Sequence, residues 1–170
     1  MNISTKLKEK IEKIQFIAFD FDGVFTDNLV YTSETGEETV SCWRSDGLGL
    51  SKIKEISIPI WVISTETNPV VSERCKKLGI DHIQGCNNKL ESLKKLISKF
   101  GVTLAEVAYV GNDINDRQCL KQVCLPIVVA DAHIDVLDLG QYITKASGGR
   151  GAVREVCDLI YNVKYTEGDL

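Results

Sequence analysis

The strongest constraint on the fold is a short apolar run that ends in two closely spaced acids. Residues 16–19 read Phe-Ile-Ala-Phe, a composition typical of a buried strand, and Asp20 and Asp22 follow directly. Side chains alternate along an extended chain, so the two acids share one side. A carboxylate at the edge of an apolar layer needs a compensating partner, and ligands bind at this edge of open α/β sheets. Asp20 and Asp22 are therefore candidate site residues, although a strand that runs into an acidic surface turn is the plain alternative.

Charge and cysteine usage exclude several classes of protein. The chain has 170 residues and a net charge of −4, which suits one domain and argues against a nucleic-acid platform. It contains no apolar stretch long enough to span a bilayer and no secretory signal pattern, so we expect a cytoplasmic protein. The six cysteines form no Cys-x-x-Cys pair and lie apart from the two histidines, which favours reduced thiols over zinc or disulfides.

Strand-like and helix-like segments alternate along the chain. Strands are expected at 16–19, 58–63, 81–84, 107–110, 127–130 and 141–144, with helices before the first strand, between successive strands and after residue 151. This alternation predicts an α/β fold, a three-layer Rossmann-like parallel sheet with helices on both faces. We expect a single domain over residues 1–163, followed by a polar tail at 164–170.

A second pattern interrupts the alternation after the first strand. Two short β-rich runs flank a polar turn that contains Gly36, which predicts a β-hairpin over about residues 28–43. So small a hairpin needs something to pack on. It could cover a site formed by the two acids or contact another subunit.

Polar residues follow several of the predicted strands, and a parallel sheet would bring them to one edge. Ser64 follows the second strand, and Asn112, Asp113 and Asp116 follow the strand at 107–110. Carboxylates gathered in one crevice repel one another unless a cation joins them, and Mg²⁺ prefers such oxygen ligands together with phosphate oxygens. Together with the positive charge of Lys89, these carboxyl, amide and hydroxyl groups suit phosphoryl transfer through an Asp nucleophile.

These residues resemble the four motifs of the haloacid dehalogenase-like phosphatases. The stretch 20–27 resembles the first motif, Ser64 with Ile63 the second, Lys89 the third and residues 111–116 the fourth. The resemblance implies that Asp20 is the nucleophile, that Asp22 is the general acid and base, that Ser64 binds the phosphoryl group and that Lys89 neutralises charge. Only the hairpin separates the first two motifs, so the chain looks like the branch without a cap domain.

Along almost its whole length the chain is similar to the 3-deoxy-D-manno-octulosonate 8-phosphate phosphatases and their nonulosonate 9-phosphate relatives. The most specific stretch is Gly-Gly-Arg-Gly-Ala-Val-Arg-Glu-Val-Cys-Asp-Leu at 148–159. The resemblance implies a homotetramer whose neighbouring subunits cover the active sites. It implies Mg²⁺ held by Asp20, Asp22, Asn112 and Asp113, with Asp116 behind them. The phosphate- and substrate-binding residues that we expect are Gly23, Asp46, Thr65, Glu66, Arg74 and Arg150.

Two positions depart from the octulosonate pattern. Asn112 stands where Asp is common, so the metal site loses a negative charge and Mg²⁺ binding is expected to weaken. Glu66 stands where Arg is usual and resembles the nonulosonate branch, in which it pairs with an Arg at the position of Arg74. A surface ion pair between Glu66 and Arg74 is the plain alternative. Arg150 suits a sugar-acid carboxylate, in its own subunit or a neighbouring one, and equally a solvated turn.

The sequence therefore predicts a Mg²⁺-dependent phosphatase of 3-deoxy-2-keto sugar acids that acts on octulosonate 8-phosphate. A nonulosonate 9-phosphate is the alternative substrate. A non-catalytic tetramerisation module beside a sugar-acid cytidylyltransferase is a rival that only Asn112 favours. A signalling receiver domain is a second rival, but receivers phosphorylate an Asp after a later strand and have no use for the hairpin.

Overall fold

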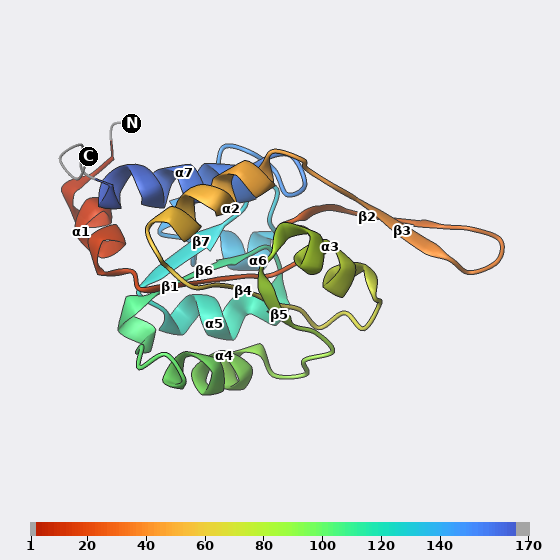
Figure 1. Cartoon of the computed structure of the whole chain (residues 1–170), viewed down its shortest axis with the longest axis horizontal. Helices are drawn as coiled ribbons and strands as arrows, with labels where there is room; N and C mark the ends of the chain where they lie inside the picture. The colour runs from red at the N-terminus through yellow and green to blue at the C-terminus, as the bar shows by residue number, and fades with distance from the viewer. Residues whose placement is uncertain (1–2, 166–170) are drawn as a thin grey trace.

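The computed structural model describes residues 3–165, in which a parallel sheet of six strands carries helices and a separate two-stranded hairpin (Figure 1). The sheet order is β5-β4-β1-β6-β7-β8. Its strands are β1 (Phe16–Phe19), β4 (Ile60–Ile63), β5 (Asp81–Ile83), β6 (Val107–Gly111), β7 (Leu125–Val128) and β8 (Tyr142–Ile143). The helices are α1 (Thr5–Lys13), α2 (Asp46–Glu55), α3 (Val70–Leu78), α4 (Lys89–Ser98), α5 (Arg117–Gln122), α6 (Ile134–Leu137) and α7 (Ala152–Lys164), with the 3₁₀ turns η1 (Leu104–Glu106) and η2 (Ile114–Asp116).

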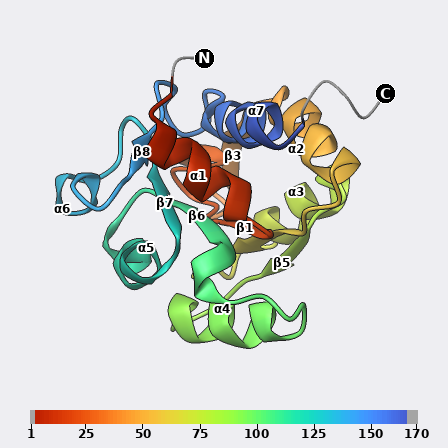
Figure 2. The same cartoon turned by 90° about the vertical axis from the view of Figure 1, so that its left-hand side faces the viewer.

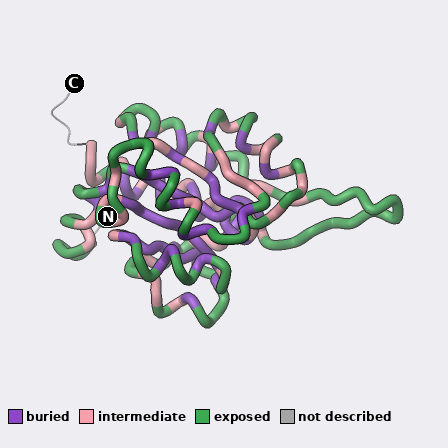
Figure 3. Tube along the Cα trace, turned by 90° about the horizontal axis from the view of Figure 1, so that it is seen from below, coloured by how far each residue is buried: buried purple, intermediate pink, exposed green. Residues whose placement is uncertain are grey.

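Helices cover both faces of the sheet, which confirms the three-layer α/β prediction. Figure 2 shows α1, α2 and α7 on one face and α4 and α5 on the other. The central strands β1 and β6 are buried along their whole length, as their continuous apolar sequences predict for parallel strands (Figure 3). All strand pairs within this sheet are parallel, so the carboxyl ends of the strands share one edge.

The hairpin consists of β2 (Thr26–Thr32) and β3 (Glu38–Cys42), close to the predicted span, and it extends away from the sheet (Figure 1). It leaves from the edge at which β1 ends. Its antiparallel register pairs Val30 with Val40. Leu29, Val30 and Tyr31 are 55%, 54% and 57% exposed, so the described residues leave a run of large apolar side chains in contact with solvent.

A few boundaries differ from the sequence prediction. Strand β7 begins at Leu125 rather than at residue 127 and ends at Val128, because the backbone N–H of Ala130 already bonds the side chain of Thr144. Helix α7 ends at Lys164, so it includes the first residue of the tail predicted at 164–170, and residues 166–170 of that tail lie outside the described residues. Within residues 3–165, no helix is both long enough and apolar enough to cross a membrane.

Candidate active site

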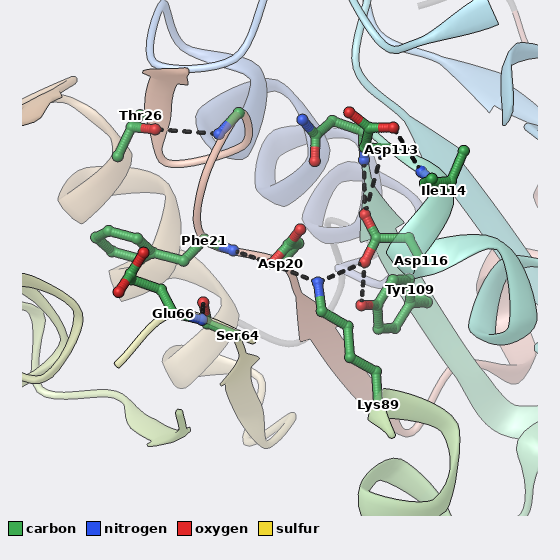
Figure 4. Close-up of polar contacts among 12 residues, drawn as sticks. Asp20, Phe21, Thr26, Ser64, Glu66, Lys89, Tyr109, Asp113, Ile114 and Asp116 are labelled. Carbon is green, nitrogen blue, oxygen red and sulfur yellow. Dashed lines mark hydrogen bonds and ion pairs between the residues drawn. The ribbon is translucent and has the colours of Figure 1, made fainter. Parts of the chain in front are cut away.

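A buried lysine between two buried aspartates forms the centre of the candidate site. The Lys89 Nζ lies 2.7 Å from Asp20 Oδ1 and 2.8 Å from Asp116 Oδ1 (Figure 4). Asp20 directly follows β1, Lys89 opens α4 and Asp116 ends η2, so three separate segments meet at the sheet edge. Burying a charge is costly unless it is paired, and each of these charges has a partner. The topology therefore brings two predicted catalytic residues together with Asp116.

Burial and mutual charge shift the pKa values of this group in identifiable directions. Burial raises the pKa of Asp20 well above its usual range, the charge of Asp116 raises it further, and Lys89 opposes both. Burial alone would lower the pKa of Lys89, but the two carboxylates outweigh that effect and raise it. The pKa of Asp22 is raised by burial and then by the negative charges of Glu66 and Glu38. Asp22 is therefore biased toward holding a proton, which a general acid requires.

Asp116 stabilises the loop after β6 through hydrogen bonds to its backbone and to Tyr109. Its carboxylate accepts hydrogen bonds from the hydroxyl of Tyr109 at 2.6 Å and from the backbone N–H of Asn112 at 2.9 Å. A Cβ atom at Gly111 would lie 2.5 Å from Asp116 Oδ2, so this approach requires glycine. Tyr109 is not among the site residues predicted from the sequence. The signal was present, because a tyrosine inside an otherwise apolar strand needs a partner for its hydroxyl.

An oxygen-rich cavity lies beside Asp20, and all four predicted metal ligands line it. The lining shares carboxyl, amide and hydroxyl groups and includes Asp20, Asp22, Asn28, Thr65, Asn112 and Asp113. The Oδ1 of Asn112 is buried and has no hydrogen-bond partner, so it is an oxygen donor available to a ligand. Gly23, with φ of +74°, makes room for Asn112, because a Cβ there would lie 1.9 Å from its Nδ2.

This donor set fits a hard cation that takes oxygen ligands. Within residues 3–165 no group of three or more His, Cys, Asp or Glu side chains could hold a metal ion. The oxygen donors that line the cavity are instead the carboxyl groups of Asp20, Asp22 and Asp113 together with the amide oxygen of Asn112. One oxygen of Asp113 already has a partner, because its Oδ1 accepts the N–H of Ile114 at 2.7 Å.

The loop after β4 contains Ser64 and Glu66. The predicted pairing of Glu66 with Arg74 is wrong, because each side chain has other partners. Ser64 is buried, and its Oγ accepts the N–H of Glu66 at 3.0 Å. Glu66 Oε1 accepts the N–H groups of Thr67 and Asn68 at 2.6 and 2.7 Å, which fixes the turn before α3. The Arg74 guanidinium instead donates to the carbonyl oxygen of Trp43 at 3.0 Å. The structure therefore places Arg74 at the end of the hairpin and not on Glu66 or in the cavity.

Asp46 also lies elsewhere than predicted. It is fully buried in the first turn of α2, and its Oδ1 accepts the backbone N–H of Arg154 at 3.1 Å. It therefore connects α2 to α7 instead of lining the cavity that contains Asp20, which corrects its assignment to substrate binding. Its Oδ2 is buried without a partner.

The buried carboxyl of Asp46 predicts a pH-dependent stability. Burial raises its pKa from 3.8 to about 6, so the folded state favours the protonated form. The stability that the folded state gains from its preference for protonated Asp46 is fully present below about pH 4 and is lost as the pH rises to about 6. The variant Asp46→Asn keeps an acceptor for Arg154 but cannot ionise. We expect its unfolding free energy, relative to the wild type, to rise by up to about 3 kcal/mol over that interval and then level off. Urea unfolding between about pH 4 and pH 8 measures this difference, and a constant difference would contradict it.

The glycine-rich loop before α7 supports the segment that carries Asp20. The N–H of Gly149 donates to the carbonyl of Val24 at 3.0 Å, and that of Gly148 donates to Asp131 Oδ1 at 2.9 Å. Arg150, whose side chain is 59% exposed, donates to Asp27 Oδ2 at 3.2 Å. The loop therefore contacts residues 20–27 and supports their position. No rule of helix formation predicts this role.

Gly149 and Gly101 provide a matched pair for testing this support. Their φ values are +60° and +68°, so an alanine at either position carries a similar backbone strain of about 1 kcal/mol. A Cβ at Gly149 would lie 2.3 Å from the backbone nitrogen of Asp27, whereas nothing lies within 4 Å of one at Gly101. We expect Gly149→Ala to lower kcat/KM for the phosphatase reaction predicted from the sequence at least tenfold. We expect Gly101→Ala to lower only the free energy of unfolding. Equal effects on activity would show that the loop does not brace the site.

Comparison with known proteins defines the class of enzyme to which this chain is related. Residues 68–155 match the haloacid dehalogenase-like hydrolase family, and the chain belongs to this family. It is 39% identical, over 159 residues that are 93% of this chain and 85% of the relative, to the 3-deoxy-D-manno-octulosonate 8-phosphate phosphatase of Salmonella typhi. These similarities confirm the resemblance recognised in the sequence.

Solved structures agree with this result. The structure of the same phosphatase from Yersinia pestis has a TM-score of 0.92 at 34% identity and covers 95% of this chain and 88% of its own. The structure of this phosphatase from Moraxella catarrhalis is a complex with magnesium ion, phosphate ion and 3-deoxy-D-manno-octulosonate (KDO). It has a TM-score of 0.91 at 34% identity, and the match covers 95% of this chain and 94% of that one. None of these relatives favours the nonulosonate or the tetramerisation-module alternative.

Proposed function

We propose that this chain is a Mg²⁺-dependent phosphatase that hydrolyses 3-deoxy-D-manno-octulosonate 8-phosphate to the free sugar acid and phosphate. The observation that carries the proposal is the contact of Lys89 with Asp20 beside a cavity that contains the unpartnered oxygen of Asn112. A nucleophile, a fixed positive charge and oxygen donors are the components that phosphoryl transfer requires. The similarity to octulosonate 8-phosphate phosphatases supports the substrate.

In the proposed mechanism Asp20 is the nucleophile and Asp22 is the general acid and then the general base. A carboxylate oxygen of Asp20 attacks phosphorus, and the bond from phosphorus to the C8 oxygen breaks as Asp22 donates a proton to that oxygen. Asp22 then removes a proton from water, whose oxygen attacks phosphorus and releases phosphate and Asp20. Ser64 and Thr65 bind phosphoryl oxygens, and Lys89 holds Asp20 in place and offsets negative charge. Asp20, the carbonyl of Asp22, Asn112 and Asp113 would hold Mg²⁺, which supplies positive charge to the phosphoryl oxygens.

The amide of Asn112 leads to a prediction about metal affinity. Replacing Asn112 with Asp adds a negative charge at an oxygen that already has no partner. We expect the variant to lower the Mg²⁺ concentration that gives half-maximal activity about three- to tenfold, because ligand charge tunes cation affinity. Titration of phosphate release against Mg²⁺ measures the change. An unaltered half-saturation value would mean that Asn112 does not ligate the metal.

We further propose that the chain assembles as a homotetramer in the cytoplasm. The exposed apolar residues Leu29, Val30 and Tyr31 suit burial against neighbouring subunits, because a monomer gains nothing from such a patch. All six cysteines are free, as expected in a reducing compartment. With a partner's surface over the cavity, the hairpin would take the place of a cap domain.

Phosphate release from a panel of sugar phosphates, with and without Mg²⁺, tests the proposed function. We expect octulosonate 8-phosphate to give the highest kcat/KM and EDTA to abolish turnover. A higher kcat/KM for a nonulosonate 9-phosphate would overturn the substrate assignment. No release from any member of the panel would overturn the enzymatic function.

A further inference from the structure

A second cavity adjoins the first beneath the hairpin. It lies between the hairpin and the loop that precedes α3, and it has a volume of about 220 Å³. Asp22 and Asn28 line both cavities, so the second continues from the phosphoryl site. Its other polar groups come from Thr26 on β2, from Glu38 on β3, and from Glu66 and Asn68 in the loop. A space of this size, continuous with the reacting centre, suits the organic part of a small substrate.

The structure fixes one oxygen of each glutamate and leaves the other available. Glu38 Oε2 accepts a hydrogen bond from Asn68 Nδ2 at 3.2 Å, and this bond joins the hairpin to the loop. Glu66 Oε1 is taken by the backbone N–H groups of Thr67 and Asn68. Among the described residues, no hydrogen bond or ion pair uses Glu38 Oε1 or Glu66 Oε2. The cavity therefore offers hydrogen-bond acceptors at fixed positions.

Charge decides which part of a substrate this cavity can receive. The lining contains three carboxyl groups and no Lys, Arg or His. A sugar-acid carboxylate placed here would meet like charges, which is unfavourable, whereas a hydroxyl can donate a hydrogen bond to a carboxylate oxygen. The pocket thus favours the polyhydroxyl portion and turns the acid group of the substrate outward.

We propose that Glu38 is a specificity-determining residue that accepts a hydrogen bond from a hydroxyl of the sugar, with Asn68 holding its carboxylate in place. This inference rests on the proposed function and deepens it, because it assigns the orientation of the substrate. Glu38 comes from the hairpin, so the hairpin contributes a substrate contact to the site of its own chain. Neither the motifs nor the matched strand ends point to this residue.

The test compares Glu38→Gln with Glu37→Gln on two substrates. Glu37 precedes Glu38 in the chain, is exposed and does not line the cavity, so it controls for a loss of charge on the hairpin. Glutamine at position 38 retains an oxygen that can accept from Asn68 but weakens the bond to a hydroxyl. The substrates are octulosonate 8-phosphate and p-nitrophenyl phosphate, which has no sugar hydroxyls.

We expect Glu38→Gln to raise KM for octulosonate 8-phosphate about tenfold with kcat within twofold, and to leave KM for p-nitrophenyl phosphate unchanged or lower. We expect Glu37→Gln to match the wild type on both. Equal behaviour of the two variants would overturn the inference, as would an equal loss of both substrates by Glu38→Gln. Failure of the proposed function would appear in the wild type instead, as turnover of p-nitrophenyl phosphate without turnover of octulosonate 8-phosphate, and the Glu38 assignment would fall with it.

Discussion

Replacing Asp20 with Asn is expected to lower kcat for phosphate release by at least about 10⁴-fold, because the amide cannot act as the nucleophile. The change is nearly isosteric. The oxygen of Asn can still accept the N–H of Phe21 and contact Lys89, as Asp20 Oδ1 does at 2.7 Å in each case. Phosphate release at saturating Mg²⁺ measures the loss.

The control for this prediction is Asp135→Asn, at an exposed position on α6. We expect it to match the wild type in kcat. Thermal unfolding of Asp20→Asn should stay within a few degrees of the wild type, since Lys89 keeps its contact with Asp116. A folded Asp20→Asn protein that retains more than about a tenth of the wild-type kcat would exclude Asp20 as nucleophile.

The fold and the meeting of the strand ends could be predicted because periodicity and chain order determine them. An apolar run such as residues 16–19 requires burial on both faces, and alternation with helices requires parallel strands. Parallel strands then bring Asp20 and the loop of Asn112 to one edge without any knowledge of side-chain contacts. Lys89 could be placed near them because it opens a helix at the same edge.

The partners of individual side chains could not be predicted in this way. The resemblance to the nonulosonate branch implies a pair between Glu66 and Arg74, yet Glu66 accepts nearby backbone N–H groups and Arg74 donates to a carbonyl oxygen at the end of the hairpin. Asp46 could be read as a site residue from its motif, but the packing of α2 on α7 determines where it lies. Such choices depend on distant segments that no local pattern describes.

Replacing Lys89 with Met is expected to lower both the stability of the fold and the activity. The substitution keeps much of the side-chain volume but leaves the carboxylates of Asp20 and Asp116 buried without their shared cation. Breaking a buried ion pair in this way costs about 3–5 kcal/mol. We also expect kcat/KM to fall at least about 10³-fold, because the phosphoryl group loses a fixed positive charge. Urea unfolding and phosphate release measure the two effects.

The double variant Lys89→Met with Asp116→Asn separates the two effects. The oxygen of the amide that replaces the Asp116 carboxylate can still accept the backbone N–H of Asn112, and its NH₂ group can donate to the Tyr109 hydroxyl, while one of the two uncompensated charges is gone. We therefore expect the double variant to regain about 1–3 kcal/mol relative to Lys89→Met, a non-additivity that contacting residues show. Activity should not return, because the charge that acts on phosphate is still missing. If activity returned with stability, the role of Lys89 would be to neutralise Asp116 alone, and its proposed action on the phosphoryl group would be wrong.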